Sequence, residues 1–389
     1  MTQGLVPGVN ALVEEMTRWR HDLHAHPETA FEEFRTAAFV AEQLKAFGLD
    51  VHTGLAKTGV VGVLKNGDGP SIALRADMDA LHVDEQSGVD YASTIPGKMH
   101  ACGHDGHTAM LLGAARHLST EKNFAGTVVF IFQPAEEGEG GAKVMIEEGL
   151  FDKFPVDAVY GLHNWPGMDL GTFAIKAGPV MAAYDSFTAR ITGHGAHGGM
   201  PHLGVDPVVA AAQVISAWQT VVSRTIDPHD AAVISVTQLD GGDAYNVIPD
   251  EVILKGAVRT FEDEVRDTVW RRMTVLAEGI CRGFGAEFFI ERHRSYPATV
   301  NADTEAGLAA LAAADVVGPH NVDHHPTPSM GAEDFAYMLG EKPGCYVWMG
   351  NGPGTGGCLL HNPQYDFNDE ALAYGASYWV RLVESLLAR

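Results

Sequence analysis

A thiol, three imidazoles and a carboxylate lie within the nine residues from Met99 to His107. Cys102 and His104 are two positions apart, so a thiolate and an imidazole can both reach one metal ion. Asp105 and the other histidines of this run can hold such ligands in place from behind. Three later segments add residues of the same chemical kinds, and the candidate ligands there are Glu136, Glu137, His163 and His361. The pattern predicts a metal site assembled from distant parts of the chain, and therefore a hydrolase.

Each of these residues also has an ordinary structural interpretation. A lone Cys-x-His pair is more often a buried cysteine beside a loop histidine. Two adjacent glutamates often begin a solvated helix, because carboxylates are favoured in a first helical turn. The chain contains no Cys-x-x-Cys, Gly-x-Ser-x-Gly, His-Glu-x-x-His or Gly-x-x-x-x-Gly-Lys motif. A zinc finger, a serine hydrolase, a zincin and a nucleotide enzyme are therefore less supported than a metal site of several segments.

Alternating strands and helices must position these residues. The hydrophobic periodicity predicts strands over 60–64, 71–76, 127–132 and 158–162, and helices over 9–23, 35–47, 106–118 and 142–149. This alternation predicts an α/β fold with a doubly wound, mostly parallel sheet, in which ligands bind beyond the carboxyl ends of the strands. The acidic or imidazole residues Asp77, Asp79, Glu136, Glu137 and His163 follow three of these strands. We expect them at one edge of the sheet, with the aspartates supporting the metal ligands.

The pattern changes near Tyr184. It predicts strands over 184–192, 231–238, 252–260 and 287–290, and helices over 205–222 and 265–283. This order is typical of a small α+β domain of the ferredoxin-like kind with one exposed sheet edge. We place it as an insert at residues 182–294. The catalytic, metal-binding domain then comprises residues 1–181 and 295–389 and closes with a helix over 370–387.

Composition limits the classes of partner. The 389 residues are 46% hydrophobic and 20% charged, with a net charge of −24, which indicates a globular chain of more than one domain. The acidic balance argues against binding to nucleic acid or to an anionic membrane. Four cysteines are too few for a disulfide scaffold, and no apolar run approaches the roughly 18 residues of a membrane span. The N-terminus lacks a signal-like apolar region, so a cytoplasmic protein is expected.

The sequence resembles the M20 metallopeptidase family, in its amidohydrolase branch. The segments that carry the resemblance are residues 20–28, 74–81, 100–107, 132–138, 246–249 and 331–335. The resemblance implies two divalent metal ions of Mn²⁺, Zn²⁺, Co²⁺ or Ni²⁺, whose ligands are Cys102, His104, Glu137, His163 and His361. It also implies that Glu136 is the general base. The wider family more often has a carboxylate in place of Cys102, and a softer thiolate leaves the identity of the metal open.

The resemblance also implies roles for the inserted domain as a lid and a dimerisation domain. His197, in the glycine-rich segment 193–202, falls on the residue that reaches the neighbouring subunit's active site and stabilises the oxyanion. Asn246 and Arg259 fall where related enzymes hold the carboxylate of the substrate. The ordinary alternatives are a loop histidine that binds nothing and an exposed strand arginine. The assembly that the resemblance implies is a homodimer, with a tetramer as the alternative.

The expected activity is hydrolysis of an N-acyl-amino acid to a carboxylic acid and a free amino acid. One alternative is a metallo-dipeptidase or aminoacyl peptidase of the same family, which would need a pocket for a free α-amino group. The other is a catalytically silent metal-binding homologue. Glu136 disfavours the silent homologue, because that residue is not needed for metal binding. One departure from many relatives is His82, which stands after Leu81 where they have proline.

Overall fold

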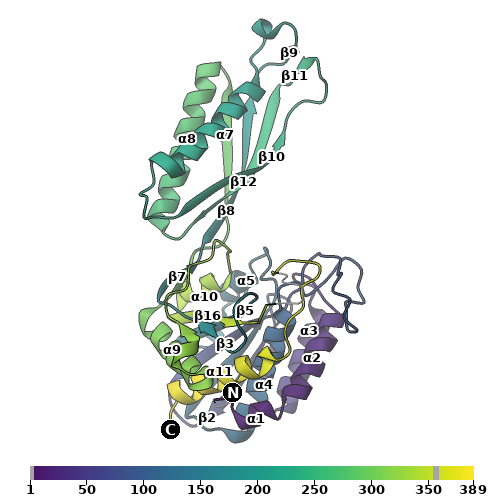
Figure 1. The fold of residues 1–389 in the computed structure, drawn as a ribbon, viewed down its shortest axis with the longest axis vertical. Helices are drawn as coiled ribbons and strands as arrows, with labels where there is room; N and C mark the ends of the chain where they lie inside the picture. Colours follow the sequence, from purple (N-terminus) through teal and green to yellow (C-terminus); the bar gives the residue numbers. More distant parts are fainter. Residues whose placement is uncertain (1–3, 354–358) are drawn as a thin grey trace. The chain divides into compact units, whose positions relative to one another are not determined.

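The computed structural model describes residues 4–353 and 359–389, so Cys358 lies outside the described part of the chain. Two compact units are present (Figure 1). The first comprises Met1–Val180, Thr299–Thr327 and Asp334–Arg389, and the second comprises Met181–Ala298 and Pro328–Glu333. The chain therefore leaves the first unit to build the second, returns, and later adds the short segment Pro328–Glu333 to the second unit.

An eight-stranded sheet lies at the centre of the first unit, in the order β1-β2-β4-β3-β5-β16-β6-β15. Its strands are β1 (Asp50–Leu55), β2 (Gly59–Asn66), β3 (Ser71–Asp77), β4 (Gly126–Gln133), β5 (Ala158–Trp165), β6 (Phe173–Ala174), β15 (Val322–Asp323) and β16 (Gly344–Gly350). The four central strands are parallel to one another, whereas β1 and β2 form an antiparallel edge. A mixed α/β fold with a large, mostly parallel sheet confirms that part of the sequence prediction.

Helices cover the sheet and complete the core of the first unit. They are α1 (Pro7–Asn10), α2 (Val13–Ala25), α3 (Phe34–Ala46), α4 (His104–Glu121), α5 (Gly141–Glu147), α6 (Leu150–Lys153), α9 (Asp303–Val317), α10 (Phe335–Glu341) and α11 (Ala371–Leu386). Helix α4 packs against α2, α11 and β3. Alternate residues of the central strands, among them Leu74, Phe130 and Tyr160, join its apolar residues in one buried cluster. Among the described residues, no helix is both long and apolar enough to cross a membrane.

The central strand β16 was not predicted, although all seven of its residues are buried. It pairs in parallel with β5 over its full length, from Gly344 opposite Val159 to Gly350 opposite Trp165. A short apolar run bounded by glycines has no period that separates a strand from a buried helix, which explains the omission. The predicted helix over 9–23 is instead two helices, α1 and α2, separated at Ala11 and Leu12.

The second unit contains a four-stranded antiparallel sheet in the order β10-β12-β8-β13. Its elements follow along the chain as β8 (Ala183–Thr192), α7 (Pro207–Arg224), β10 (Ala232–Asp240), β12 (Glu251–Thr260), α8 (Asp263–Phe284) and β13 (Glu287–Arg294). The two helices pack together and enclose a separate core around Phe187, Trp218 and Trp270. Asp206 caps α7 by accepting hydrogen bonds from the amides of Val208 and Val209.

Short elements complete both units. They are the two-stranded pairs β9 (Ala196–His197) with β11 (Val247–Ile248) and β7 (Gly178–Met181) with β14 (Thr299–Asn301), and the 3₁₀ segments Pro201–Leu203 and Pro319–Asn321. The β9–β11 pair lies in the second unit, at the end of the sheet where β8 finishes and β12 begins (Figure 1).

Replacing Gly344 by alanine is expected to destabilise the first unit by about 1–3 kcal/mol. An added Cβ would lie 2.0 Å from the carbonyl oxygen of Val159 and 2.8 Å from Leu339 Cδ2, which would force β16 away from β5. Urea unfolding measures the change. Gly340→Ala in α10 is the control, because no atom lies within 4 Å of an added Cβ there. Equal stabilities for the two variants would contradict this account of β16.

Candidate metal centre

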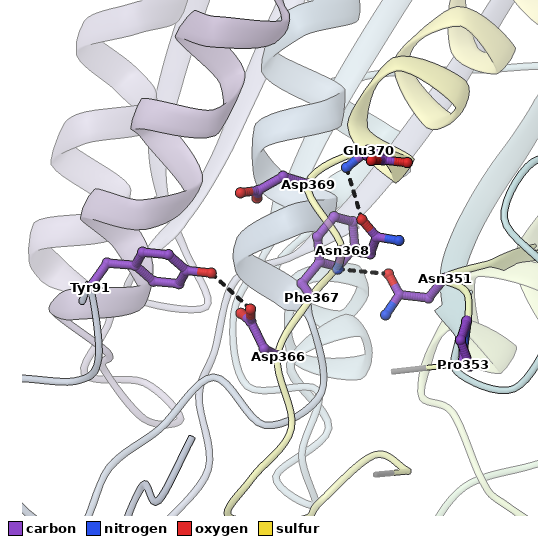
Figure 2. A pocket seen from close by; sticks show the side chains of 8 residues that line it. All are labelled: Tyr91, Asn351, Pro353, Asp366, Phe367, Asn368, Asp369 and Glu370. Carbon is purple, nitrogen blue, oxygen red and sulfur yellow. Dashed lines mark hydrogen bonds between the residues drawn. The ribbon is translucent and has the colours of Figure 1, made fainter. Parts of the chain in front are cut away.

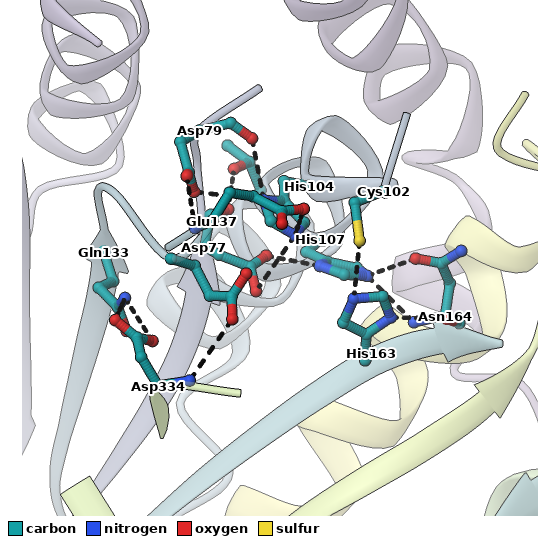
Figure 3. Close-up of polar contacts among 12 residues, drawn as sticks. Asp77, Asp79, Cys102, His104, His107, Gln133, Glu137, His163, Asn164 and Asp334 are labelled. Carbon is teal, nitrogen blue, oxygen red and sulfur yellow. Dashed lines mark hydrogen bonds and ion pairs between the residues drawn. The ribbon is translucent and has the colours of Figure 1, made fainter. Parts of the chain in front are cut away.

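The candidate ligands meet at the carboxyl ends of β3, β4 and β5 (Figure 3). Asp77 is the last residue of β3, and His163 lies near the end of β5. Glu136 and Glu137 follow the end of β4 at Gln133. Parallel strands deliver their carboxyl ends to one edge, so residues far apart in the sequence become neighbours there.

Gly103 allows Cys102 and His104 to enter this edge from the loop before α4. Its φ is +90°, a left-handed conformation that glycine adopts without steric cost. An added Cβ would lie 2.3 Å from Asn164 Oδ1 and 2.7 Å from Tyr365 Oη. The glycine therefore permits the close approach that places the thiol and the imidazole on either side of it.

The six predicted side chains all offer ligand atoms to the cluster, namely those of Cys102, His104, Glu136, Glu137, His163 and His361, and Asp77 and His107 offer further ones beside His104. Cys102 Sγ lies 3.3 Å from His163 Nε2, and His361 Nε2 lies 3.2 Å from Glu137 Oε1. The ligand atoms of Cys102, His104 and His163 are all within 4.8 Å of one another. The same holds for Cys102, Glu137 and His361. Two sets that share the thiol are an arrangement able to hold two neighbouring ions.

The imidazoles are oriented in the way that metal ligands require. Nδ1 of His104 donates to the carbonyl oxygen of Asp79 at 2.9 Å, and Nδ1 of His163 donates to the carbonyl oxygen of Asn164 at 2.6 Å. Each Nδ1 thus has a carbonyl partner, and each Nε2 is the ring nitrogen that a bound metal would take in place of a proton. His104 Nε2 is buried without a hydrogen-bond partner among the described residues. A buried nitrogen without a partner is costly unless an ion binds it, so these residues fit a divalent metal.

The electrostatics of the cluster call for a cation. Burial raises the pKa of the Cys102 thiol far above its usual value, and the neighbouring Glu137 and Glu136 raise it further. Burial lowers the pKa of His104, but Asp77 and Asp79 outweigh burial and raise it to about 10. A divalent cation would compensate this negative charge and stabilise the thiolate.

Asp77 and Asp79 contact residues of the cluster directly. Asp79 Oδ2 accepts a hydrogen bond from the amide of Glu137 at 2.9 Å. Asp77 Oδ2 lies 3.8 Å from His104 Nε2, and its Oδ1 bonds His107 Nδ1 at 2.6 Å. His107 in turn bonds Asn164 Oδ1 at 2.7 Å (Figure 3). Asn164 was not among the residues expected at the site, and its position directly after His163 is its only signal in the sequence.

Asp105, which was expected to support the metal ligands, contacts residues of α2. Its carboxylate bonds His24 Nδ1 at 2.8 Å and lies 3.7 Å from Arg20 Nη1. Burial lowers the pKa of His24, but hydrogen bonds to Asp105 and Glu85 outweigh it and raise the pKa to about 9. Asp105 therefore ties the start of α4 to α2 through its contacts with His24 and Arg20.

Arg20 also bonds two residues in the wall of a cavity of about 370 Å³ (Figure 2). Arg20 donates to Asp366 Oδ1 and Asp369 Oδ1, each at 2.8 Å. Tyr91 Oη donates to Asp366 Oδ2 at 2.7 Å. The lining residues are Tyr91, Asn351, Pro353, Asp366, Phe367, Asn368, Asp369 and Glu370. No candidate metal ligand is among them, so this acidic network supports the fold behind the cluster.

A smaller cavity of about 210 Å³ adjoins the cluster through Glu137. Its other lining residues are Thr29, Ala30, Glu32, Ala80, Leu81, His82 and Glu139. His82 is exposed and contributes to this wall. The cavity offers space for a small organic group beside the candidate ligand Glu137.

The predicted residues of the second unit fall into two groups. His197 is exposed in β9, where its Nδ1 accepts from the amide of Gly199 at 3.0 Å. Asn246 is also exposed. It lies next to His197, because its carbonyl oxygen accepts a hydrogen bond from the amide of Gly198 at 2.7 Å. Arg259 is half-buried in β12, donates to the carbonyl oxygen of Met330 at 2.5 Å, and lies 4.7 Å from the ring centroid of Tyr184.

The sheet of the second unit separates these groups. Arg259 pairs with Tyr184 at one end of β12, and Glu251 pairs with Thr192 at the other. Eight residues of extended strand span about 26 Å. His197 and Asn246 lie beyond the Glu251 end, because the amide of Gly193 bonds Asp250 there. Within one chain, a small ligand held by Arg259 is thus out of reach of His197 and Asn246.

A parallel α/β sheet whose carboxyl edge gathers a thiol, imidazoles and paired glutamates is the construction of a metal-dependent hydrolase. The family described as Peptidase family M20/M25/M40 matches residues 73–385. Hippurate hydrolase of Campylobacter jejuni is 41% identical over 379 residues, which are 97% of this chain and 98% of that protein. N-acetylcysteine deacetylase of Bacillus subtilis is 41% identical over 371 residues, or 95% and 96% of the two chains.

A solved structure agrees. The YxeP protein of Bacillus subtilis, described as a dinuclear metal binding peptidase from the M20 family, has a TM-score of 0.85. It is 37% identical, with 97% of this chain and 99% of that chain covered. The chain therefore belongs to the M20 peptidase family, in its amidohydrolase branch. The resemblance drawn from the sequence motifs is confirmed.

Removing bound metal with a chelator is expected to lower the melting temperature, because an ion that binds only the folded state stabilises it. Re-addition of Mn²⁺, Zn²⁺, Co²⁺ or Ni²⁺ should restore the melting temperature.

Cys102→Ser should weaken metal binding at least about tenfold, measured by elemental analysis after equilibrium dialysis. Cys281→Ser, which removes a buried thiol of α8 in the second unit, is the control. Unchanged metal affinity in Cys102→Ser would remove Cys102 from the ligand set.

Proposed function

We propose that this protein hydrolyses the amide bond of N-acyl-amino acids and releases a carboxylic acid and a free amino acid. The observation that carries the proposal is the pair Glu136 and Glu137 beside a cluster of candidate ligands. Glu137 Oε1 faces His361 and His104 at 3.2 and 3.9 Å. Glu136 is also within the cluster and is buried. Relatives at 41% identity are named for hydrolysis of hippurate and deacetylation of N-acetylcysteine, which are both N-acylated amino acids.

The proposed resident cofactors are two divalent ions of Mn²⁺, Zn²⁺, Co²⁺ or Ni²⁺. Their proposed ligands are Cys102, His104, Glu137, His163 and His361, with Asp77 and Asp79 orienting them. When bound, these ions would supply positive charge that lowers the pKa of a water molecule and polarises the acyl carbonyl. Asp105 acts more remotely in this proposal, by holding the start of α4 through His24 and Arg20.

Glu136 is the proposed general base and acid. Its carboxylate takes one proton from the attacking water as the new C–O bond forms at the acyl carbon. The same carboxyl group then gives that proton to the amide nitrogen as the C–N bond breaks, so the amine leaves neutral. The amide of Asp334 donates to Glu136 Oε1 at 3.4 Å, which helps hold the carboxylate towards the cluster.

The substrate is bound by groups of complementary character. The 210 Å³ cavity beside Glu137 has apolar walls at Ala30, Ala80 and Leu81, and we assign it to the acyl group or the amino-acid side chain. Arg259 is the proposed partner of the substrate carboxylate. A chain with a net charge of −24 needs such a fixed cation to receive an anion. Closure of the second unit as a lid would bring Arg259 to the substrate.

A second copy of the chain would complete the site. His197 and Asn246 are exposed and about 26 Å of strand separates their end of the sheet from Arg259. We assign them to the active site of a partner subunit, where His197 would stabilise the oxyanion and Asn246 would bind the substrate. The assembly is then a homodimer, or a tetramer built from such dimers. Free thiols at Cys102, Cys281 and Cys345 support a cytoplasmic location.

A peptidase is the second candidate function. The YxeP protein is described as a peptidase, and Glu32 and Glu139 in the wall of the 210 Å³ cavity are able to bind a free α-amino group. A catalytically silent homologue is the least supported alternative, since Glu136 is in place beside the cluster.

The substrate class is tested by amino-acid release from N-acetyl, N-benzoyl and unblocked dipeptide substrates, with enzyme reloaded separately with each metal. Release from the blocked substrates is expected. Glu136→Gln should keep its metal and lose about 10²–10⁴-fold in kcat, while Glu147→Gln, which changes an exposed residue of α5, retains hydrolysis of blocked substrates. Release from free dipeptides alone would establish the peptidase. No release with any metal would leave the silent homologue.

Mixing two inactive variants tests the assignment of His197 to the partner subunit. His197→Ala and Glu136→Gln homodimers should each lose most activity. Subunit exchange between them creates a mixed dimer in which one active site has both an intact Glu136 and an intact His197 from the other copy. Activity should therefore return, up to about a quarter of the wild-type value for random exchange, as measured by turnover and by size-exclusion chromatography. Absence of recovery in a mixture shown to exchange would place His197 in its own subunit's site.

A further inference from the structure

Three turns of the first unit meet at the carboxylate of Glu33, which is fully buried at the start of α3. Glu33 Oε1 accepts hydrogen bonds from the amides of Phe31 at 3.1 Å and Ala135 at 3.0 Å. Its Oε2 accepts from Thr58 Oγ1 at 2.6 Å. One side chain therefore joins the segment before α3, the β1–β2 turn and the segment after β4.

The three turns share an unusual backbone. Phe31 has φ +60°, Ala56 and Lys57 have φ +48° and +66°, and Ala135 has φ +56°. Non-glycine residues seldom adopt this left-handed conformation, and they keep it only where the surroundings hold them there. Four of the six such residues in the described part of the chain thus lie in turns that converge on Glu33.

Among these turn residues, Ala135 lies nearest in the sequence to the proposed general base Glu136 and the candidate ligand Glu137. It is fully buried and stands directly before Glu136 and Glu137. Strand β4 ends at Gln133, so the amide of Ala135 has no ladder partner and needs another acceptor. Its carbonyl oxygen is held from the other side by the amide of Gly141 at 2.9 Å. The direction in which the chain leaves Ala135 sets where the next two carboxylates point.

Glu33 has no counter-charge among the described residues that would explain its burial as an ion pair. Burial is the main cause that raises its pKa to about 7, and the negative charge of Asp79 contributes, against the hydrogen bond from Thr58. A buried carboxylate without a cation is costly. The three contacts of Glu33 show that its carboxylate serves as a fixed hydrogen-bond acceptor for Phe31, Thr58 and Ala135.

We propose that Glu33 is a positioning residue for the hydrolytic reaction, which fixes Ala135 in its left-handed conformation and thereby aims Glu136 and Glu137 at the metal cluster. The inference rests on the proposed function. Glu33 touches neither the ligands nor the substrate in this role. It acts through the backbone of one residue, from a helix start more than a hundred positions earlier in the chain.

Four variants test the role. Glu33→Ala removes the acceptor, and Glu33→Asp keeps the charge but shortens the reach by one methylene. Glu33→Gln keeps the geometry, because its amide oxygen can accept both backbone bonds while its amide nitrogen donates to Thr58. Glu28→Ala is the matched control. Glu28 also accepts two backbone amides at the start of α3, from Arg35 at 3.0 Å and Thr36 at 2.8 Å, but these bonds do not involve Ala135.

With saturating metal, Glu33→Ala and Glu33→Asp should lose about 10–100-fold in kcat, since a misplacement of about 1 Å can cost this much, with KM changed less than about threefold. Glu33→Gln should stay within about threefold of wild type in both. Hydrogen exchange of the peptide that contains Ala135 should speed up in the Ala and Asp variants only. Glu28→Ala should lower the melting temperature and leave kcat and this exchange unchanged.

Three outcomes would overturn the proposal. They are full kcat in Glu33→Asp, a loss in Glu33→Gln equal to that in Glu33→Ala, and an equal loss of kcat in Glu28→Ala. Failure of the proposed function is distinguishable, because it would appear as absence of hydrolysis in the wild-type enzyme. The exchange rate at Ala135 would still report whether Glu33 holds this turn.

Discussion

Negative charge gathered at the carboxyl edge of the central sheet is the constraint on which the first unit depends. Asp77, Asp79, Glu136 and Glu137 lie together with a buried thiol. The negative charge of Asp77, Asp79 and Glu137 raises the pKa of His104, which burial alone would lower. Hydrogen bonds from backbone amides and from Arg75, which donates to Asp77 at 2.6 Å, offset part of this charge. The remainder is the electrostatic basis for binding divalent cations.

Holding such a cluster requires backbone that sequence propensity disfavours. Gly103, Ala135 and His361 have φ of +90°, +56° and +63°, and each is a candidate ligand or lies beside one. Left-handed residues persist where packing and hydrogen bonds determine them from several sides. Glu33 bonds the amide of Ala135, and the carbonyl oxygen of Ala101 bonds the amide of His361 at 2.8 Å. Hydrogen bonds to a few left-handed residues thus help to fix the carboxyl edge of the sheet.

The two units meet different demands. The first unit holds its candidate ligands at the edge of a parallel sheet, with Cys102, His104 and His163 buried and His361 exposed. The second has its own core around Trp218 and Trp270 and leaves His197 and Asn246 exposed in short strands and turns. Because about 26 Å of strand separates that end from Arg259, one copy of the second unit offers two chemically distinct ends. A homodimer would use both.

The sequence by itself determined the candidate ligand types, the adjacency of Glu136 and Glu137, the family and the strands β3, β4 and β5, because local spacing and apolar periodicity record these features directly. It did not reveal β16, whose seven buried residues have no diagnostic period, nor the contact of Glu33 with Ala135. It grouped Asp105 with Asp77 and Asp79, yet the fold turns Asp105 towards His24. It also grouped Asn246 with Arg259, which the sheet holds apart. Contacts between residues a hundred positions apart follow from how strands and helices pack, and only the tertiary structure decided them.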